Sequence, residues 1–71
     1  MWERYELQDE ETKEVKLVYE LKRDVANDMV SKRYRCRFYD KSKDKWKEYS
    51  GTFTKEDAKN RLRQEYERRS H

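Results

Sequence analysis

Hydrophobic and polar residues alternate with a period of two along much of the chain, which predicts β-strands with one buried face. The alternation is clearest in two stretches, whose apolar positions are Val15, Leu17, Tyr19 and Leu21 in the first and Tyr34, Cys36 and Phe38 in the second. A weaker strand is predicted over residues 2–8 and a fourth over residues 46–53. Turns are expected at residues 9–13 and 26–28, the second because Asn and Asp favour turns.

The pattern changes to a helical period after residue 53. Thr54 is a good N-cap, and Asp57 stands three residues later as in a capping box. Ala58, Leu62 and Tyr66 then recur every four residues, a narrow stripe that suits a helix lying on a sheet. A helix is therefore predicted over residues 55–68.

The predicted fold is a single small α+β domain of order ββββα, with an antiparallel sheet and one C-terminal helix packed on one face. At 71 residues there is room for one domain only. Charged residues make up 49% of the chain, but an aromatic content of 14% argues against disorder. Charge divides the chain into an acidic hairpin over residues 1–24 (net −3), a basic hairpin over 25–53 (net +4) and a helix over 54–69.

Several function classes are disfavoured. No apolar run is long enough to span a membrane, and Met1 is followed by Trp2, Glu3 and Arg4 instead of the apolar stretch of a secretory signal. The single cysteine, Cys36, is expected in the core, and the single histidine, His71, offers no metal cluster or catalytic triad. We therefore expect a non-enzymatic cytoplasmic protein without a cofactor or metal.

Two smaller features have structural interpretations. The acidic residues of 9–14 could bind a divalent cation, but their spacing fits no calcium loop, and a solvated hairpin tip explains them better. Trp2 is expected to cover the edge of the core, with an exposed position in an interface as the alternative.

The hairpin of the third and fourth strands carries the main functional signal. With residues 41–44 as its loop, Asp40 pairs with Lys45, Tyr39 with Trp46, Arg37 with Glu48 and Arg35 with Ser50. A slip by one residue would bury the arginines, so this register is favoured. It gathers a set of basic and aromatic side chains on the open face and at the tip: Arg33, Arg35, Arg37, Tyr39, Trp46, Lys41, Lys43 and Lys45.

This combination favours binding to nucleic acid, with duplex DNA as the preferred form. Lysine and arginine gain affinity by releasing counterions from phosphates, and arginine can read guanine in the major groove. Aromatic side chains pack on sugars or stack on unpaired bases. The alternative is a solvated sheet face whose charges only maintain solubility.

Residues 33–66 resemble the amino-terminal arm-binding domains of tyrosine-recombinase integrases from phages and transposons, which share a fold with the plant ethylene-response-factor DNA-binding domains. Arg33-Tyr34-Arg35 and Phe38-Tyr39-Asp40 match the family's first strand motif, and Gly51, Phe53, Thr54, Lys55 and Ala58 match its turn and helix start. The resemblance implies a sheet that enters the major groove in a phage or mobile-element context. It also implies Lys47 as a contact, although the predicted register turns that side chain towards the helix.

Other readings of the chain remain open. Single-strand-binding modules of ββββα order share the predicted topology. A chain this small and this charged could instead bind a protein, as a phage-type inhibitor or adaptor of a host protein, through its sheet edge or its acidic hairpin. The composition also leaves a homodimer open.

Overall fold

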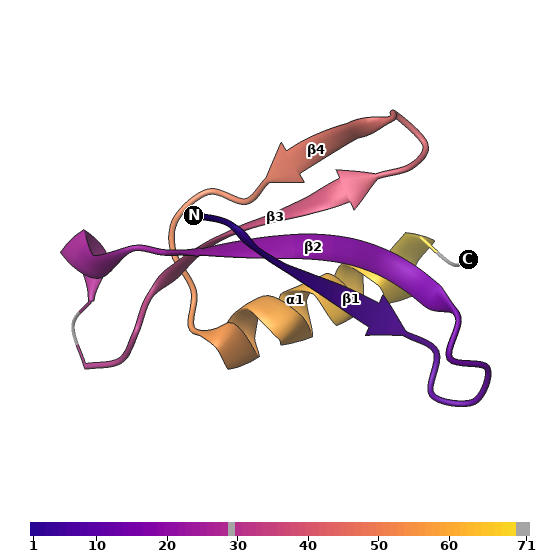
Figure 1. The fold of residues 1–71 in the computed structure, drawn as a ribbon, viewed down its shortest axis with the longest axis horizontal. Coiled ribbons are helices and arrows are strands. Elements are labelled where there is room, and N and C mark those ends of the chain that lie inside the picture. Colours follow the sequence, from indigo (N-terminus) through magenta and orange to yellow (C-terminus); the bar gives the residue numbers. More distant parts are fainter. Residues whose placement is uncertain (29, 70–71) are drawn as a thin grey trace.

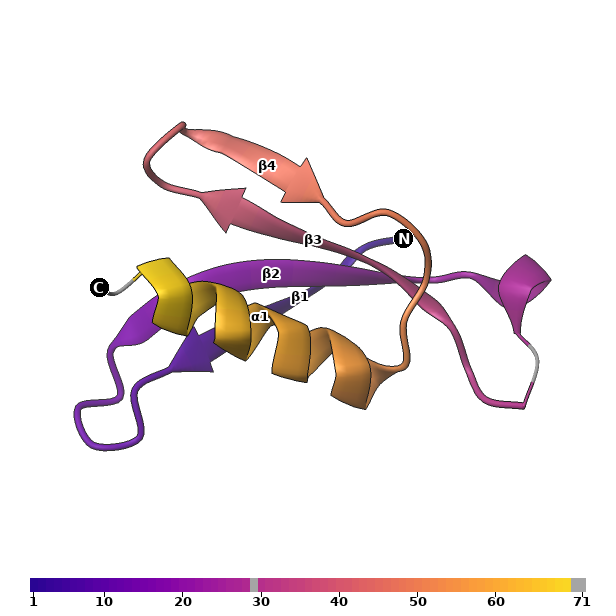
Figure 2. The same cartoon turned by 180° about the vertical axis from the view of Figure 1, so that it is seen from behind.

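The computed structural model describes residues 1–28 and 30–69, and its elements follow the predicted order (Figure 1). Four strands form one antiparallel sheet in chain order: β1 (Glu3–Gln8), β2 (Val15–Arg23), β3 (Tyr34–Asp40) and β4 (Lys45–Glu48). Helix α1 (Lys55–Arg69) lies across one face of this sheet and leaves the other uncovered (Figures 1 and 2). The predicted α+β fold is confirmed, and the uncovered side is called the open face below.

The core lies between the sheet and α1 and is made by the alternating residues that the sequence indicated. Its buried members are Leu17, Tyr19, Leu21, Tyr34, Cys36, Phe38, Ala58 and Leu62. Phe38 and Leu62 are both fully excluded from solvent, one on the sheet and one on the helix. Tyr49 and Phe53 pack against this cluster from the chain that leads to α1. The apolar residues that alternate along the strands and those that recur every four residues along the helix therefore pack together in one small core.

The start of the helix is stabilised as predicted. The hydroxyl oxygen of Thr54 accepts a hydrogen bond from the backbone N–H of Asp57 at 3.1 Å, which satisfies one of the free donors of the first turn. Ala58 and Leu62 are buried, whereas Tyr66, the third residue of the stripe, is half-buried. The stripe is therefore anchored most firmly in its first two turns.

The fourth strand is shorter than predicted. It ends at Glu48, and the chain then bulges away from β3 before a single bridge joins Phe53 to Tyr34. Uniform pairing would place Gly51 opposite Tyr34, but Gly51 has a φ of +83°, a left-handed conformation that breaks the extended chain. The predicted pairing of Arg35 with Ser50 is therefore wrong, because the ladder stops before Ser50.

The turn predicted at residues 26–28 is part of a longer connection that begins with a short 3-10 helix, Val25–Asn27. Asp28 organises this connection. Its carboxylate forms an ion pair with Arg23 and accepts the backbone N–H of Arg33 at 2.7 Å. These two contacts lower the pKa of Asp28, the hydrogen bond from Arg23 having the larger effect.

The thiol of Cys36 is expected to react slowly in the native protein. The thiol is fully buried, and burial raises its pKa from 9.0 to about 11. The thiolate fraction at pH 8 is then about 100-fold smaller than at the ordinary pKa, so we expect reaction with Ellman's reagent to be at least about 100-fold slower in the native protein than in guanidinium chloride. Equal rates in the two solvents would place Cys36 outside the core.

Candidate nucleic-acid interface

The hairpin of β3 and β4 has the register that places its basic residues as predicted. Asp40 pairs with Lys45, Tyr39 with Trp46 and Arg37 with Glu48. Residues 41–44 form the loop, in which Asp44 adopts a left-handed φ of 51°. Asp40 is buried, and its carboxylate accepts hydrogen bonds from the backbone N–H and hydroxyl of Ser42 at 3.1 and 2.6 Å. The loop that presents the lysines is therefore tied to the end of β3.

The three arginines of the predicted contact row are all engaged within the protein. Arg33 donates to the hydroxyl oxygen of Thr52 at 3.2 Å and to its carbonyl oxygen at 2.5 Å. Arg35 donates two parallel hydrogen bonds of 2.8 Å to the carboxylate of Glu48. These arginines are placed on the side of the sheet that the alternation predicted, but they do not present free guanidinium groups.

Arg37 has the most enclosed environment of the three. It donates from Nε to Glu20 at 2.8 Å, and its Nη2 lies 2.5 Å from the same carboxylate. Glu20 belongs to β2 and is only 6% exposed, although it lies on the open face. Arg4 approaches the second oxygen of Glu20 at 3.4 Å from β1. The buried carboxylate of β2 thus pairs with one guanidinium group from β1 and one from β3, so this ionic cluster links three strands.

Two tryptophans complete this layer. The guanidinium carbon of Arg37 lies 4.0 Å from the ring centroid of Trp2 and 5.0 Å from that of Trp46. Arg35 also lies over Trp2, at 5.2 Å. Cation–π contacts of this kind stabilise by about 0.5–1 kcal/mol each at exposed sites. The open face is therefore a prearranged layer of arginines between indole rings.

The expectation that Trp2 covers the edge of the core is wrong. Trp2 lies on the open face, where it contacts Arg35 and Arg37. A signal for this position was present in the sequence, because strict alternation with Tyr5 and Leu7 on the helix side puts residues 2, 4 and 6 on the other side. Its arginine partners are remote in sequence and could not be read from that pattern.

The tip lysines differ from the arginines. Lys41, Lys43 and Lys45 are all exposed, and within residues 1–28 and 30–69 no carboxylate forms an ion pair with any of them. Tyr39 and Trp46, at the ends of β3 and β4 that lead into this loop, lie on the open face with ring centroids 5.6 Å apart in an edge-to-face arrangement, whereas Lys45 lies on the helix side. The Tyr39 hydroxyl donates to Asp44 of the loop. Free positive charge and ordered aromatic surface therefore adjoin at one end of the sheet.

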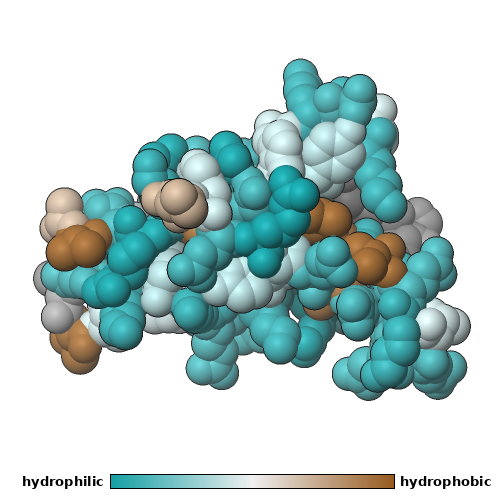
Figure 3. Space-filling view, in the orientation of Figure 1, coloured by the Kyte–Doolittle hydropathy of each residue, from teal (hydrophilic) through white to brown (hydrophobic). Residues whose placement is uncertain are grey.

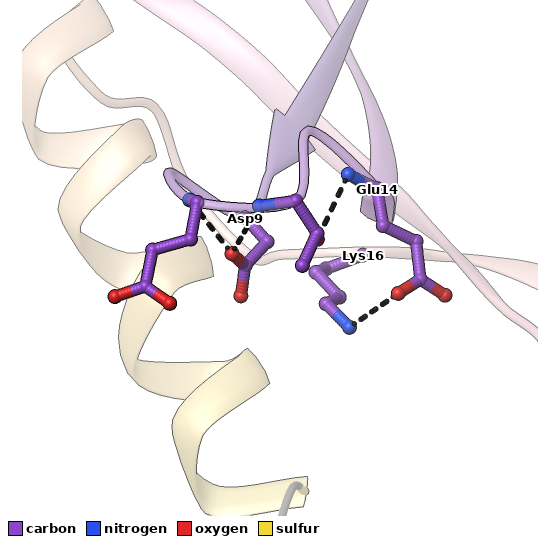
Figure 4. Close-up of polar contacts among 5 residues, drawn as sticks. Asp9, Glu14 and Lys16 are labelled. Atoms are coloured by element: carbon purple, nitrogen blue, oxygen red, sulfur yellow. Dashed lines mark hydrogen bonds and ion pairs between the residues drawn. The ribbon is translucent and has the colours of Figure 1, made fainter.

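The first hairpin contributes a different surface. The carboxylate of Asp9 accepts backbone N–H groups of Glu11 and Thr12 at 2.9 and 3.0 Å, and Glu14 pairs with Lys16 at 3.0 Å (Figure 4). The acidic residues of this turn thus include one that stabilises the turn itself. Among residues 1–28 and 30–69 no group of three or more side chains is arranged to hold a metal ion.

Electrostatics reinforce the pairing on the open face. The two hydrogen bonds from Arg35 hold the pKa of Glu48 below its ordinary value of 4.5, against the opposing effect of partial burial. Glu48 therefore stays ionised over the whole neutral range, and the ion pair weakens only as the pH falls below about 4.5. The open face seen in Figure 3 is mostly hydrophilic, with small separate apolar patches.

Comparisons of the chain with protein-family models, with curated protein sequences and with solved structures find no significant match. The resemblance of residues 33–66 to integrase arm-binding domains therefore stays a prediction. In the part of the chain that the structure describes, no helix is both long enough and apolar enough to span a membrane.

Proposed function

We propose that the protein is a small nucleic-acid-binding module whose basic hairpin contacts duplex DNA. The observation that supports this most directly is the tip of the hairpin, where three exposed lysines have no ion-pair partner among the described residues. Such lysines raise the affinity for nucleic acid, because each phosphate that they neutralise releases condensed counterions. A phage or mobile-element setting, which the resemblance implies, and a cytoplasmic location, which is a separate expectation from the sequence, belong to the same proposal.

The proposed roles of the candidate residues differ, because their environments in the fold differ. Lys41, Lys43 and Lys45 supply the phosphate contacts, while Tyr39 and Trp46 pack against the sugar–phosphate backbone. Arg35 is the arginine best able to join them, because its side chain is 42% exposed and its partner Glu48 is 37% exposed. Arg37 instead has a structural role in the arginine and tryptophan layer of the open face, since it is paired with the buried carboxylate of Glu20.

Fluorescence anisotropy with labelled duplex DNA, single-stranded DNA and RNA at two salt concentrations tests this proposal. With roughly five phosphates neutralised, log affinity should fall with log salt at a slope of about −4 to −5. Duplex DNA should bind most tightly. Absence of binding to any of the three below about 100 µM at low salt would contradict the proposal.

Neutralising the tip is expected to have a specific effect. The triple variant Lys41→Gln, Lys43→Gln, Lys45→Gln should lose roughly 100-fold in affinity for duplex DNA at ~0.1 M salt, with a slope shallower by about three. The matched control removes three exposed lysines outside β3, β4 and the loop between them, Lys13, Lys32 and Lys59, by the same substitution. An equal loss in both variants would show that only net charge matters.

A protein partner is the second candidate, and one observation favours it. Strand β1 is an outer strand of the sheet, six residues long, and its far edge pairs with no other strand among the described residues. A partner could extend the sheet by adding a strand there, beside the acidic hairpin. This mode predicts that the tip variant keeps full affinity for its partner, whereas a proline at Glu6 within β1 removes it.

A further inference from the structure

A groove between β4 and the second half of α1 lies on the helix side of the sheet, opposite the open face that carries Arg35, Tyr39 and Trp46. It has a volume of about 500 Å³ and is lined by Lys47, Tyr49, Arg61, Gln64, Glu65 and Arg68. Three of these six side chains are cations and one is an acid. The only acid, Glu65, forms an ion pair with Arg68 of the same helix. The groove therefore keeps an excess of positive charge.

Two of the cations are available to a ligand. Within residues 1–28 and 30–69 no carboxylate forms an ion pair with Lys47 or Arg61. Both residues are exposed. Arg61 is also held in place, because its guanidinium carbon lies 5.1 Å from the ring centroid of Tyr49 and 5.6 Å from that of Phe53. A guanidinium that is already ordered loses less conformational entropy when it binds an anion.

The groove continues from the tip of the basic hairpin. Lys45 and Lys47 lie on the same face of β4, since they pair with Asp40 and Phe38, whose side chains point towards α1. The C-terminal end of α1 and the loop between β3 and β4 lie at the same end of the molecule in both views of the ribbon (Figures 1 and 2). Free cations therefore run from the loop, along β4, into the groove.

We propose that this groove binds phosphate groups of the nucleic acid that the hairpin tip contacts, so that the bound backbone passes around the β4 edge onto the helix side. This inference rests on the proposed function. Arginine and lysine together suit a phosphodiester, because the guanidinium donates two parallel hydrogen bonds and the ammonium adds a point charge. Arg61 and Lys47 are the principal contacts, and Gln64 can donate a further hydrogen bond.

The decisive experiment is an NMR titration of the ¹⁵N-labelled wild-type protein with a short duplex DNA. Resonances of the Lys47 and Gln64 amides and of Arg61 Nε should shift together with those of the tip lysines, and at the same DNA concentration. Arg63 Nε, on another side of the helix, serves as the internal control and should not move. Shifts at the tip without shifts in the groove would overturn the groove inference and leave the proposed function intact.

The other outcomes are equally distinct. No shift anywhere would overturn the proposed function and, with it, this inference. Polyglutamate at the same charge concentration should leave the groove resonances in place. If it shifts them as much as DNA does, the groove accepts any polyanion and its assignment to phosphate is wrong.

A pair of variants gives an independent measurement. Each phosphate contact contributes up to about eightfold in affinity at ~0.1 M salt, so Lys47→Gln with Arg61→Gln should weaken duplex binding by about 30-fold and make the salt slope shallower by about two. The control removes two cations from other parts of the helix, through Lys59→Gln with Arg63→Gln. Equal losses in the two variants would overturn the inference. If the groove variant fails to fold, the titration of the wild-type protein still decides the question.

Discussion

Replacing Arg37 with alanine is expected to lower the free energy of unfolding by about 2–4 kcal/mol. The reason is the carboxylate of Glu20, which is 6% exposed and, among residues 1–28 and 30–69, would keep only Arg4, at 3.4 Å, as an ionic partner. Breaking a buried ion pair by removing one member costs about 3–5 kcal/mol, and the partial exposure of Arg37 reduces that figure. The loss of contacts with two tryptophans adds a smaller penalty.

Urea denaturation followed by tryptophan fluorescence measures this effect, since Trp2 and Trp46 both lie against Arg37. The matched control is Arg35→Ala, which breaks a largely exposed ion pair and should cost less than about 1 kcal/mol. Adding Glu20→Gln to the Arg37→Ala variant should restore part of the lost stability, because it removes the uncompensated charge. If Arg35→Ala and Arg37→Ala lower the free energy of unfolding equally, the ion pair of Arg37 with Glu20 contributes no more to stability than an exposed pair does.

Leu62→Ala is expected to destabilise the protein by about 2–4 kcal/mol as well, for a different reason. Leu62 is fully buried and packs into the single core beneath the sheet, so its removal leaves a cavity. Among the residues that the structure describes, the core has eight buried members, and so small a domain has few other contacts with which to compensate. Total stability in proteins is about 5–15 kcal/mol, so this one substitution would remove a large share of the free energy of unfolding.

Thermal denaturation followed by circular dichroism is the appropriate measurement for Leu62→Ala. The neighbouring substitution Arg63→Ala is the control, because it removes an exposed side chain from the same turn of the helix and should change the melting temperature little. An unchanged melting temperature for Leu62→Ala would mean that the helix does not pack on the sheet through this residue.

The three arginines of the predicted contact row are less available to a ligand than their position on the sheet suggests. Alternation alone placed Arg33, Arg35 and Arg37 on one face, and a row of cations there suggested direct contacts with nucleic acid. Each of the three has a partner within the protein, at Thr52, Glu48 and Glu20 respectively. A phosphate that binds one of these arginines must compete with its partner in the protein. Binding through the lysines of the tip and the groove therefore costs less free energy.

The order of elements, the core and the hairpin register from Asp40–Lys45 to Arg37–Glu48 followed from the sequence by itself, because these depend on local periodicity. A period of two sets which residues share a face, and burying charged residues is costly enough to exclude the slipped register of β3 and β4. The N-cap at Thr54 and the stripe through Ala58 and Leu62 similarly specified the helix. These expectations were confirmed because local preference and burial point in the same direction.

Only the tertiary structure decided which charges and rings meet. Periodicity assigns a side chain to a face but says nothing of its neighbours from distant strands, so the pairing of Arg37 with Glu20 and its packing on Trp2 could not be predicted. The early end of β4 comes with a bulge that contains Gly51, whose φ of +83° breaks the extended chain ahead of the bridge between Phe53 and Tyr34. The groove beside Arg61 likewise exists only where β4 and the helix come together, because its walls belong to segments that interact across the folded domain.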